Sequence, residues 1–357
     1  MRRERGIMMV TCTYCLEEKE FVLGRRDVFN SEHVVPQSLA LVENSLTLIG
    51  IVCRACNDWF GKNLDQPFTR GSHEALRRFL EKQKDVTKIH ELDRRKVKIS
   101  LESAKDPSIR KAQVRLIHHG GELKQQFAVQ LSIRLKNSDD WITVQRSEFQ
   151  QFVETNPDLD LSEFKILGPE LECEEFFQEM QAIWAGIKIV GNLGDEDHIT
   201  DVVVDYGPTE MRAIAKIAFN YFCYITQDRP ELARSNRFDA IRNYIRKGEV
   251  PQWVAVRLRE KPILTNDTVN RRQTNGHIVA FNVERNVSTG KNEAVCLISI
   301  FNDLTWRVVL QPEFDGELKP RIHIWDFENR TCREEVAKKV TVRVFPVLRA
   351  RTVRISR

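Results

Sequence analysis

The sequence predicts an α+β protein with a small metal-bound module at its front and a β-rich C-terminal unit. Three observations lead to this fold class. Two Cys-x2-Cys pairs bracket a 37-residue interval near the N-terminus. Helical and alternating strand patterns are mixed through the middle of the chain, and strand patterns dominate from Trp253 onward. With 41% hydrophobic and 30% charged residues, the composition is that of a globular protein able to build a core.

The length of 357 residues is comfortable for more than one domain. We expect a metal-bound module over residues 1–70, an α+β region over residues 71–186 and an α+β domain over residues 187–357. Breaks at Asn156-Pro157 and Gly168-Pro169 interrupt the middle region. The role of the last part is open between recognition and regulation.

The paired cysteines are predicted to bind a metal ion. They are Cys12, Cys15, Cys53 and Cys56. Four thiolates complete the tetrahedral shell of Zn²⁺, so the expected site is a closed, structural zinc site. The alternative is four unrelated buried thiols. Of the other cysteines, Cys223 and Cys296 stand among apolar residues and are expected in the core.

Periodicity gives the remaining elements in order. Helices are expected at 72–83 (with Ser72 as the cap), 147–155, 174–184, 208 onward and 238–246. Strands are expected at 96–103, 113–118, 127–135, 141–145, 253–259, 277–285, 294–301, 305–310, 321–327 and 340–347. The helix opened by Pro208 is apolar around most of its circumference, which is typical of a buried helix. Arg212 and Lys216 mark either its one wet stripe or a ligand-facing edge.

Charge and hydropathy bound the partners. The net charge is +4, and residues 71–110 hold eleven basic and seven acidic residues. A basic segment behind the metal motif suits a polyanion, although a solvated surface explains it equally well. No apolar run reaches the roughly 18 residues of a membrane span, and no secretory signal is recognised. We therefore expect a cytoplasmic protein without membrane partners.

The chemistry-bearing residues lie between the two cysteine pairs and just after them. His33 is a candidate general base, and the carboxylate of Glu32 is a candidate ligand for a hard divalent cation. Asn57 offers an amide oxygen to the same ion at the start of a helix expected over 57–64. Lys62 is either a phosphate contact or a solvated lysine. Because neighbouring strand residues face opposite sides, the strand must end, twist or bulge near Pro36 for Glu32 and His33 to share a site.

Together these segments resemble a known family. The segments are Cys-x2-Cys, Glu-His-Val-Val-Pro-Gln-Ser, Cys-x2-Cys-Asn and Gly-Lys-Asn-Leu-Asp, over residues 12–65. They are similar to the zinc-stapled HNH endonucleases with the ββα-metal fold. The resemblance implies that His33 is the general base and that Glu32 and Asn57 hold a catalytic magnesium or manganese ion (Mg²⁺ or Mn²⁺). It also implies phosphodiester hydrolysis that leaves 5′-phosphate and 3′-hydroxyl ends.

One position departs from the family pattern. The middle asparagine of the HNH motif would fall near Leu48 and is absent. Either Asn44 substitutes for it from the preceding loop, or the hairpin is held in another way. What orients His33 is therefore an open question for the structure.

Two functions follow as hypotheses. The first is a metal-dependent HNH endonuclease acting on nucleic acid, with DNA favoured over RNA by the family alone. The second is a non-catalytic zinc-binding module that grips nucleic acid or protein. Residues 187–357 are expected to supply a homodimer contact or to bind a regulatory partner.

Overall fold

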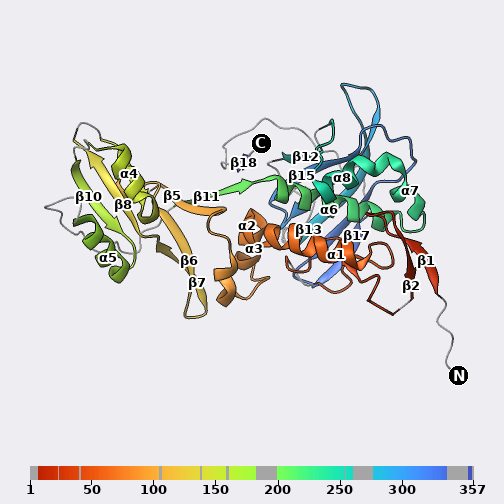
Figure 1. Cartoon of the computed structure of the whole chain (residues 1–357), viewed down its shortest axis with the longest axis horizontal. Coiled ribbons are helices and arrows are strands. Elements are labelled where there is room, and N and C mark those ends of the chain that lie inside the picture. Colours follow the sequence, from red (N-terminus) through yellow and green to blue (C-terminus); the bar gives the residue numbers. More distant parts are fainter. Residues whose placement is uncertain are drawn as a thin grey trace. The chain divides into compact units, whose positions relative to one another are not determined.

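The computed structural model describes most of the chain. The described residues are 7–22, 24–39, 42–103, 107–136, 139–157, 161–181, 199–253, 255–259, 276–335 and 353–355. They confirm a mixed α+β fold with a cysteine cluster near the N-terminus and an antiparallel C-terminal sheet (Figure 1).

The chain divides into two compact units. The first comprises Met1–Lys84, Tyr206–Val347 and Ile355–Arg357, and the second comprises Asp85–Asp205 and Leu348–Arg354. Residues 1–70 and most of 187–357, which were expected as separate domains, thus fall in the same unit. The middle region 71–186 was expected to begin and end earlier than the second unit does.

The front of the first unit consists of two short hairpins and a helical segment. Strand β1 (Met8–Thr11) pairs with β2 (Glu18–Phe21), and β3 (Glu32–His33) pairs with β4 (Thr47–Leu48), both antiparallel. The helical segment is α1 (Arg54–Phe60), the π-helical turn η1 (Gly61–Asp65), α2 (Gln66–Gly71) and α3 (His73–Leu80). The hairpin β3–β4 followed by α1 places Asn57 in a helix, as predicted.

Local sequence signals set two helix starts. Cys53 has extended backbone angles and precedes α1, so the helix begins three residues before the predicted start at Asn57. Ser72 caps α3, because its side-chain oxygen accepts a hydrogen bond from the Ala75 backbone nitrogen at 3.0 Å. The predicted capping role of Ser72 is confirmed.

The C-terminal part of the first unit is an antiparallel sheet of six strands. Their order is β12-β15-β14-β13-β16-β17. The strands are β12 (Val256–Arg259), β13 (Gly276–Arg285), β14 (Asn292–Ile300), β15 (Leu304–Gln311), β16 (Arg321–Asp326) and β17 (Thr331–Glu335). The first five match predicted strands, and β17 was not predicted. The strand expected at 340–347 lies outside the described residues.

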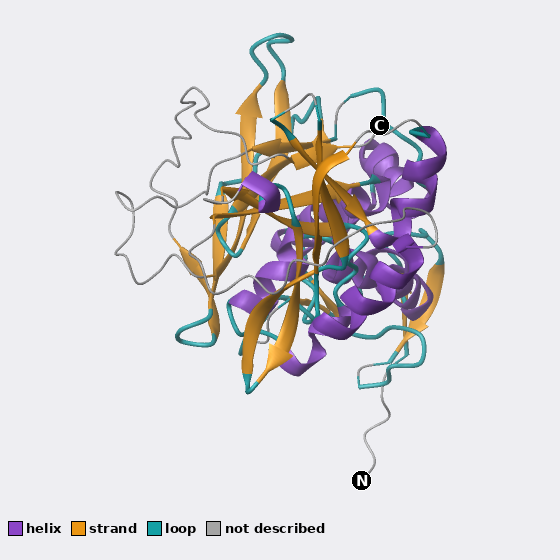
Figure 2. Ribbon diagram, turned by 90° about the vertical axis from the view of Figure 1, so that its left-hand side faces the viewer, coloured by secondary structure: helices purple, strands orange, loops and turns teal. Residues whose placement is uncertain are grey.

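Helix α6 (Pro208–Ile225) joins this sheet to the front of the unit. It contacts β13, β14 and β15, and it also contacts β4, η1 and α2. Figure 2 distinguishes the helices (purple) from the strands (orange). The buried residues of α6 lie around the whole helix, which confirms the prediction of a central buried helix. Lys216 is 0% exposed, so of the two alternatives for Arg212 and Lys216 the wet stripe is excluded for this residue.

Two shorter helices complete the first unit. Helix α7 spans Pro230–Arg234 and α8 spans Asp239–Lys247. Gly248 ends α8 with a left-handed φ of 80°, a conformation that favours glycine. Among the described helices, none combines the length and the apolar character needed to cross a membrane.

The described residues of the second unit form two sheets and two α-helices. One sheet has the order β18-β11-β5-β6-β7 and the other β10-β8-β9. The strands are β5 (Val97–Ser103), β6 (Gln113–His119), β7 (Glu122–Phe127), β8 (Gln130–Leu135), β9 (Trp141–Gln145), β10 (Leu161–Leu167), β11 (Ile199–Tyr206) and β18 (Val353–Ile355). Helices α4 (Phe149–Thr155) and α5 (Glu170–Gln181) match two predicted helices, although residues 182–184 of the second lie outside the described residues. Strands β7, β10, β11 and β18 were not predicted.

Candidate functional site

The four paired cysteines come together in one cluster. Their sulfur atoms all lie within 4.8 Å of one another, and the sulfurs of Cys15 and Cys53 are 3.8 Å apart. Two thiolates on a tetrahedral zinc ion, with bonds of about 2.3 Å, are separated by about 3.8 Å. The residues therefore fit a structural zinc ion. Bound there, zinc would tie the first cysteine pair to the start of α1.

Backbone hydrogen bonds hold the two cysteine pairs side by side. The backbone nitrogen of Cys53 donates to the sulfur of Cys12 at 3.3 Å. One residue further along, the Thr13 nitrogen donates to the Ile51 carbonyl oxygen at 2.9 Å. Donation from N–H groups to thiolate sulfur favours the charged form that zinc requires. The cluster is thus supported by contacts within the front segment itself.

The hairpin β3–β4 presents His33. The register pairs His33 with Thr47, and the Thr47 hydroxyl oxygen lies 3.3 Å from the His33 Nδ1 atom. That hydroxyl donates its own hydrogen to the Ser45 carbonyl oxygen at 3.0 Å. It therefore accepts from Nδ1–H, which leaves Nε2 as the unprotonated ring nitrogen. The orienting contact considered for Asn44, which is exposed, comes from Thr47 instead.

The protonation of His33 is biased toward the neutral ring. The side chain is half-buried. Burial lowers the pKa of His33 below its usual 6.5, and the nearby ammonium of Lys216 lowers it further. The ring is consequently neutral at pH 7, which is the form that can accept a proton.

The neighbouring Glu32 points into the core of the first unit. It is 4% exposed, and its Oε1 atom lies 2.7 Å from the Lys216 ammonium and accepts from the Asn220 amide at 2.7 Å. Burial raises the pKa of Glu32, and the charge of Lys216 opposes this rise. The alternation of a regular strand thus gives Glu32 and His33 different surroundings.

Lys216 bridges two carboxylates. Besides Glu32, its ammonium contacts both carboxylate oxygens of Asp65, at 2.7 and 2.8 Å. Burial lowers the pKa of Lys216, but the charges of Asp65 and Glu32 more than compensate, so that the pKa is raised above 10.5. Lys216 is therefore a cation at neutral pH.

The two remaining predicted residues lie along the helical segment. Asn57 is half-buried, and its amide nitrogen donates to the Asn30 side-chain oxygen at 2.9 Å and to the Ser31 carbonyl oxygen at 3.1 Å. Asn57 thereby fastens α1 to the residue that precedes Glu32. Lys62 is exposed on η1, where its side chain is free to reach a ligand in solution.

The predicted divalent-ion pair does not fit an ion in this arrangement. A hard cation needs free oxygen ligands. Glu32 Oε1 already receives an ammonium and an amide, and a second cation beside it would be repelled by Lys216. Within the described residues, the cysteine cluster is the only group of three or more histidine, cysteine or acidic side chains with metal-binding spacing.

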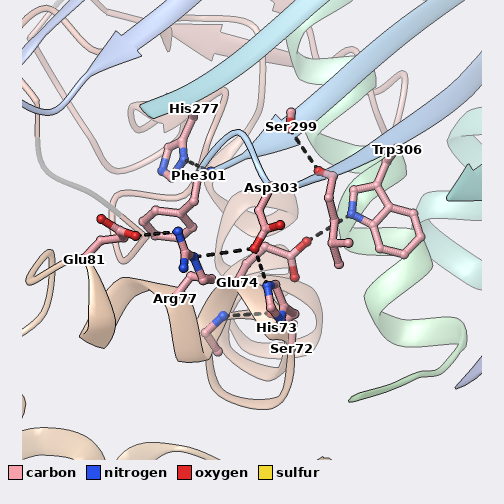
Figure 3. Close-up of polar contacts among 12 residues, drawn as sticks. Ser72, His73, Glu74, Arg77, Glu81, His277, Ser299, Phe301, Asp303 and Trp306 are labelled. Carbon is pink, nitrogen blue, oxygen red and sulfur yellow. Dashed lines mark hydrogen bonds and ion pairs between the residues drawn. The ribbon is translucent and has the colours of Figure 1, made fainter. Parts of the chain in front are cut away.

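A second set of buried polar side chains joins α3 to the sheet (Figure 3). Glu74 is fully buried, and it accepts hydrogen bonds from the Tyr206 hydroxyl at 2.6 Å and the Trp306 indole nitrogen at 3.0 Å. His73 contacts the Asp303 carboxylate at 2.7 Å. These contacts satisfy the buried groups, so the set is an anchor for α3.

His277 lies in the core. The residue is 0% exposed, and its Nδ1 atom accepts from the Phe301 backbone nitrogen at 3.1 Å (Figure 3). Burial lowers the pKa of His277 to about 3. The ring is neutral at physiological pH.

Sequence reasoning missed the residues that hold the hairpin from α6. Lys216 and Asn220 are four residues apart on the helix, hence on one face, and both contact Glu32. Asn220 also accepts from the Tyr14 hydroxyl at 2.7 Å. The available signal was two strongly polar residues inside an otherwise buried helix, because such groups need partners.

The comparisons with known proteins leave the family open. Neither protein-family models, nor curated proteins, nor solved structures gave a match to this chain. The resemblance to HNH endonucleases rests on the sequence motifs of residues 12–65.

Proposed function

We propose that the front of the first unit is an HNH-type endonuclease module of the ββα-metal kind that hydrolyses phosphodiester bonds of nucleic acid. The first cysteine pair, the hairpin β3–β4 and the second cysteine pair at the start of α1 follow one another along the chain, which supports the resemblance. Zinc on the four cysteines would fix the start of α1, and Asn57 would fix α1 to the strand that carries His33.

The tautomer of His33 carries this proposal. Thr47 gives its hydrogen to the Ser45 carbonyl oxygen and so takes a hydrogen bond from His33 Nδ1. The lone pair on Nε2 is then available, and the lowered pKa keeps it unprotonated at neutral pH. A general base needs such an unprotonated ring nitrogen at a position that solvent can reach, and His33 is only half-buried, unlike the core residue His277.

The chain's own residues account for the proton-transfer part of the reaction. Nε2 of His33 accepts a proton from the attacking water, Thr47 keeps the ring in place, and the neutral-to-cationic change of the ring occurs at the half-buried rim of the hairpin. The Mg²⁺ or Mn²⁺ ion that the family implies would stabilise charge on the phosphate and the leaving oxygen. Because the Glu32–Asn57 pair does not fit that ion here, no step is assigned to these two residues as ligands.

Cleavage assays test the proposal directly. Supercoiled plasmid and short single- and double-stranded DNA or RNA are incubated with zinc-loaded protein and Mg²⁺ or Mn²⁺. We expect nicking by the wild type and a loss on the order of 10²–10⁴-fold in rate for His33→Ala. The matched control is His90→Ala, at an exposed histidine. Equal rates for wild type and His33→Ala would reject the assignment.

The second candidate function is a non-catalytic module that binds nucleic acid or protein through a zinc-stabilised front. One observation favours it: the carboxylate of Glu32 is already occupied by Lys216 and Asn220. This function predicts retention of the same DNA or RNA by wild type and His33→Ala, with intact strands after incubation with every metal. DNA is the expected ligand. Residues 187–357 would contact a second copy of the chain or bind a regulatory partner.

A further inference from the structure

Lys216 is a buried cation that is paired with two carboxylates. The side chain is fully buried, yet it carries a charge and contacts two carboxylates, Glu32 and Asp65. Burial of an unpaired charge is strongly unfavourable. The two carboxylates make this position tolerable, and they come from β3 and from the end of η1.

The Lys216 ammonium lies among carboxylate oxygens of the kind that could otherwise bind a metal ion. Three oxygens surround it, one from Glu32 at 2.7 Å and two from Asp65 at 2.7 and 2.8 Å. Two carboxylates facing one point are the ligand type that hard cations prefer. Lys216 fills that point with a charge that is part of the chain and is always present.

Glu32 is also connected to the backbone of His33. The Asn220 amide donates both to Glu32 Oε1 at 2.7 Å and to the His33 carbonyl oxygen at 3.2 Å. The other end of the same amide accepts from the Tyr14 hydroxyl, and Tyr14 stands between the cysteines of the first pair. Glu32 therefore belongs to a continuous set of contacts that fixes β3.

We propose that Lys216 is the resident cation of the Glu32–Asp65 pair, and that Glu32 is a positioning residue for His33 instead of a ligand of a divalent ion. The positioning role rests on the proposed function of His33. The cation role does not, and it is measured without cleavage.

The first experiment measures metal binding. Zinc-loaded wild type, Glu32→Gln and the control Glu231→Gln, at an exposed glutamate, are titrated with Mn²⁺, and free Mn²⁺ is followed by electron paramagnetic resonance. We expect Glu32→Gln to bind Mn²⁺ as the wild type does, within about twofold, or both to bind none. Weakening by tenfold or more in Glu32→Gln alone would overturn the proposal, because it would make Glu32 an ion ligand.

The second experiment measures the charge pair through unfolding in urea. Lys216→Met leaves the buried carboxylate of Glu32 and the partly buried carboxylate of Asp65 without their cation, and we expect its unfolding equilibrium constant to rise on the order of 10²–10³-fold. Glu32→Gln leaves Lys216 in a one-to-one pair with Asp65 and should have a much smaller effect. In the double variant Glu32→Gln/Lys216→Met, part of the loss of Lys216→Met should be recovered.

Each outcome of this comparison between the two single variants and the double variant decides whether Glu32 and Lys216 act as a pair. If Lys216→Met does not fold but the double variant does, the charge pair is supported. If the double variant is no more stable than Lys216→Met, or if neither folds, Glu32 and Lys216 do not act as a pair and the proposal fails. Wild-type stability in Lys216→Met would equally overturn it.

The third experiment separates positioning from a merely structural role. In cleavage assays, Glu32→Gln should lower kcat while KM and the Mn²⁺ concentration dependence stay unchanged. Added to His33→Ala, the same change should cause no further loss, because Glu32 acts through His33. An additive loss would reject the positioning role. If no variant and no wild type cleaves, the proposed function fails, while the Mn²⁺ and urea results still decide the cation role.

Discussion

The cysteine cluster and the β3–β4 hairpin belong to the same short segment, but they are held by different parts of the chain. The cluster is assembled from residues between Cys12 and Cys56, with hydrogen bonds from the same segment. The hairpin depends on α6, whose Asn220 contacts Glu32 across 188 positions of sequence. One site is therefore locally encoded, and the other exists only when the C-terminal half has folded against it.

The two sites also differ in the kind of free energy that holds them. A structural zinc ion contributes about 10–16 kcal/mol in zinc-binding peptides, and that energy is folding energy. A buried ion pair such as Lys216–Glu32 is close to neutral overall, since desolvation offsets attraction, and becomes costly only when one partner is removed. The metal cluster thus supplies stability, whereas the contacts from α6 fix a particular geometry at His33.

Removal of a zinc ligand should have the largest effect. In Cys53→Ser, loss of the metal should remove much of the roughly 10–16 kcal/mol of binding free energy and unfold the front of the first unit. Zinc content by mass spectrometry and limited proteolysis measure this. Cys173→Ser, at a half-buried cysteine of the second unit, is the control. A Cys53→Ser protein with one equivalent of zinc and wild-type protease resistance would contradict the locally encoded site.

Protonation of His33 at acidic pH should lower the cleavage rate, an effect smaller than that of removing a zinc ligand. The folded His33 has a pKa below 6.5, so kcat/KM should stay level at neutral pH and fall only as the pH drops below 6.5. In the same window the unfolded chain binds more protons than the folded one, so the contribution of His33 to stability rises with pH.

Lys216→Gln sharpens this test. Because burial is the larger cause of the lowered pKa and Lys216 the smaller, the acidic limb should move upward and still remain below 6.5. Lys247→Gln, at an exposed lysine, should leave the limb in place. An unchanged limb in Lys216→Gln would show that α6 does not act on the hairpin electrostatically.

Lys62→Ala should have the smallest effect. The side chain is exposed, so stability should change by no more than about 0.5 kcal/mol. If Lys62 meets a phosphate, its loss should weaken binding of nucleic acid at every sequence and reduce the slope of log K against log salt by about one. Fluorescence anisotropy across a salt series measures the slope, with Lys319→Ala as the control. Identical slopes would make Lys62 a solvated lysine.

Patterns of short range were sufficient for much of the fold. The spacing of the cysteines predicted the cluster, Ser72 predicted the start of α3, and strand alternation predicted five of the strands in the large sheet. Each of these signals depends on neighbours in sequence. The same holds for α6, whose apolar circumference could be seen in its own residues.

The surroundings of the hairpin could not be predicted in this way. Whether Glu32 faces an ion or Lys216 depends on which helix packs against β3, and local periodicity does not contain that information. Thr47 was overlooked because the family pattern directed attention to asparagines near Leu48. The boundary near residue 187 was expected from the pattern of elements, whereas the compact units follow the contacts of α6 with the front segment.

The burial of α6 against the front segment bears on how such a protein could be cut or recombined. Phe60, Leu64 and Phe68 are fully buried, and an excised piece ending at Lys84 would leave these three side chains without the neighbouring helix α6. Such a fragment would also carry Glu32 without its ammonium. The front segment therefore does not form an independent module. A protein into which it is transplanted would also need α6, or a helix with lysine and asparagine at the same spacing.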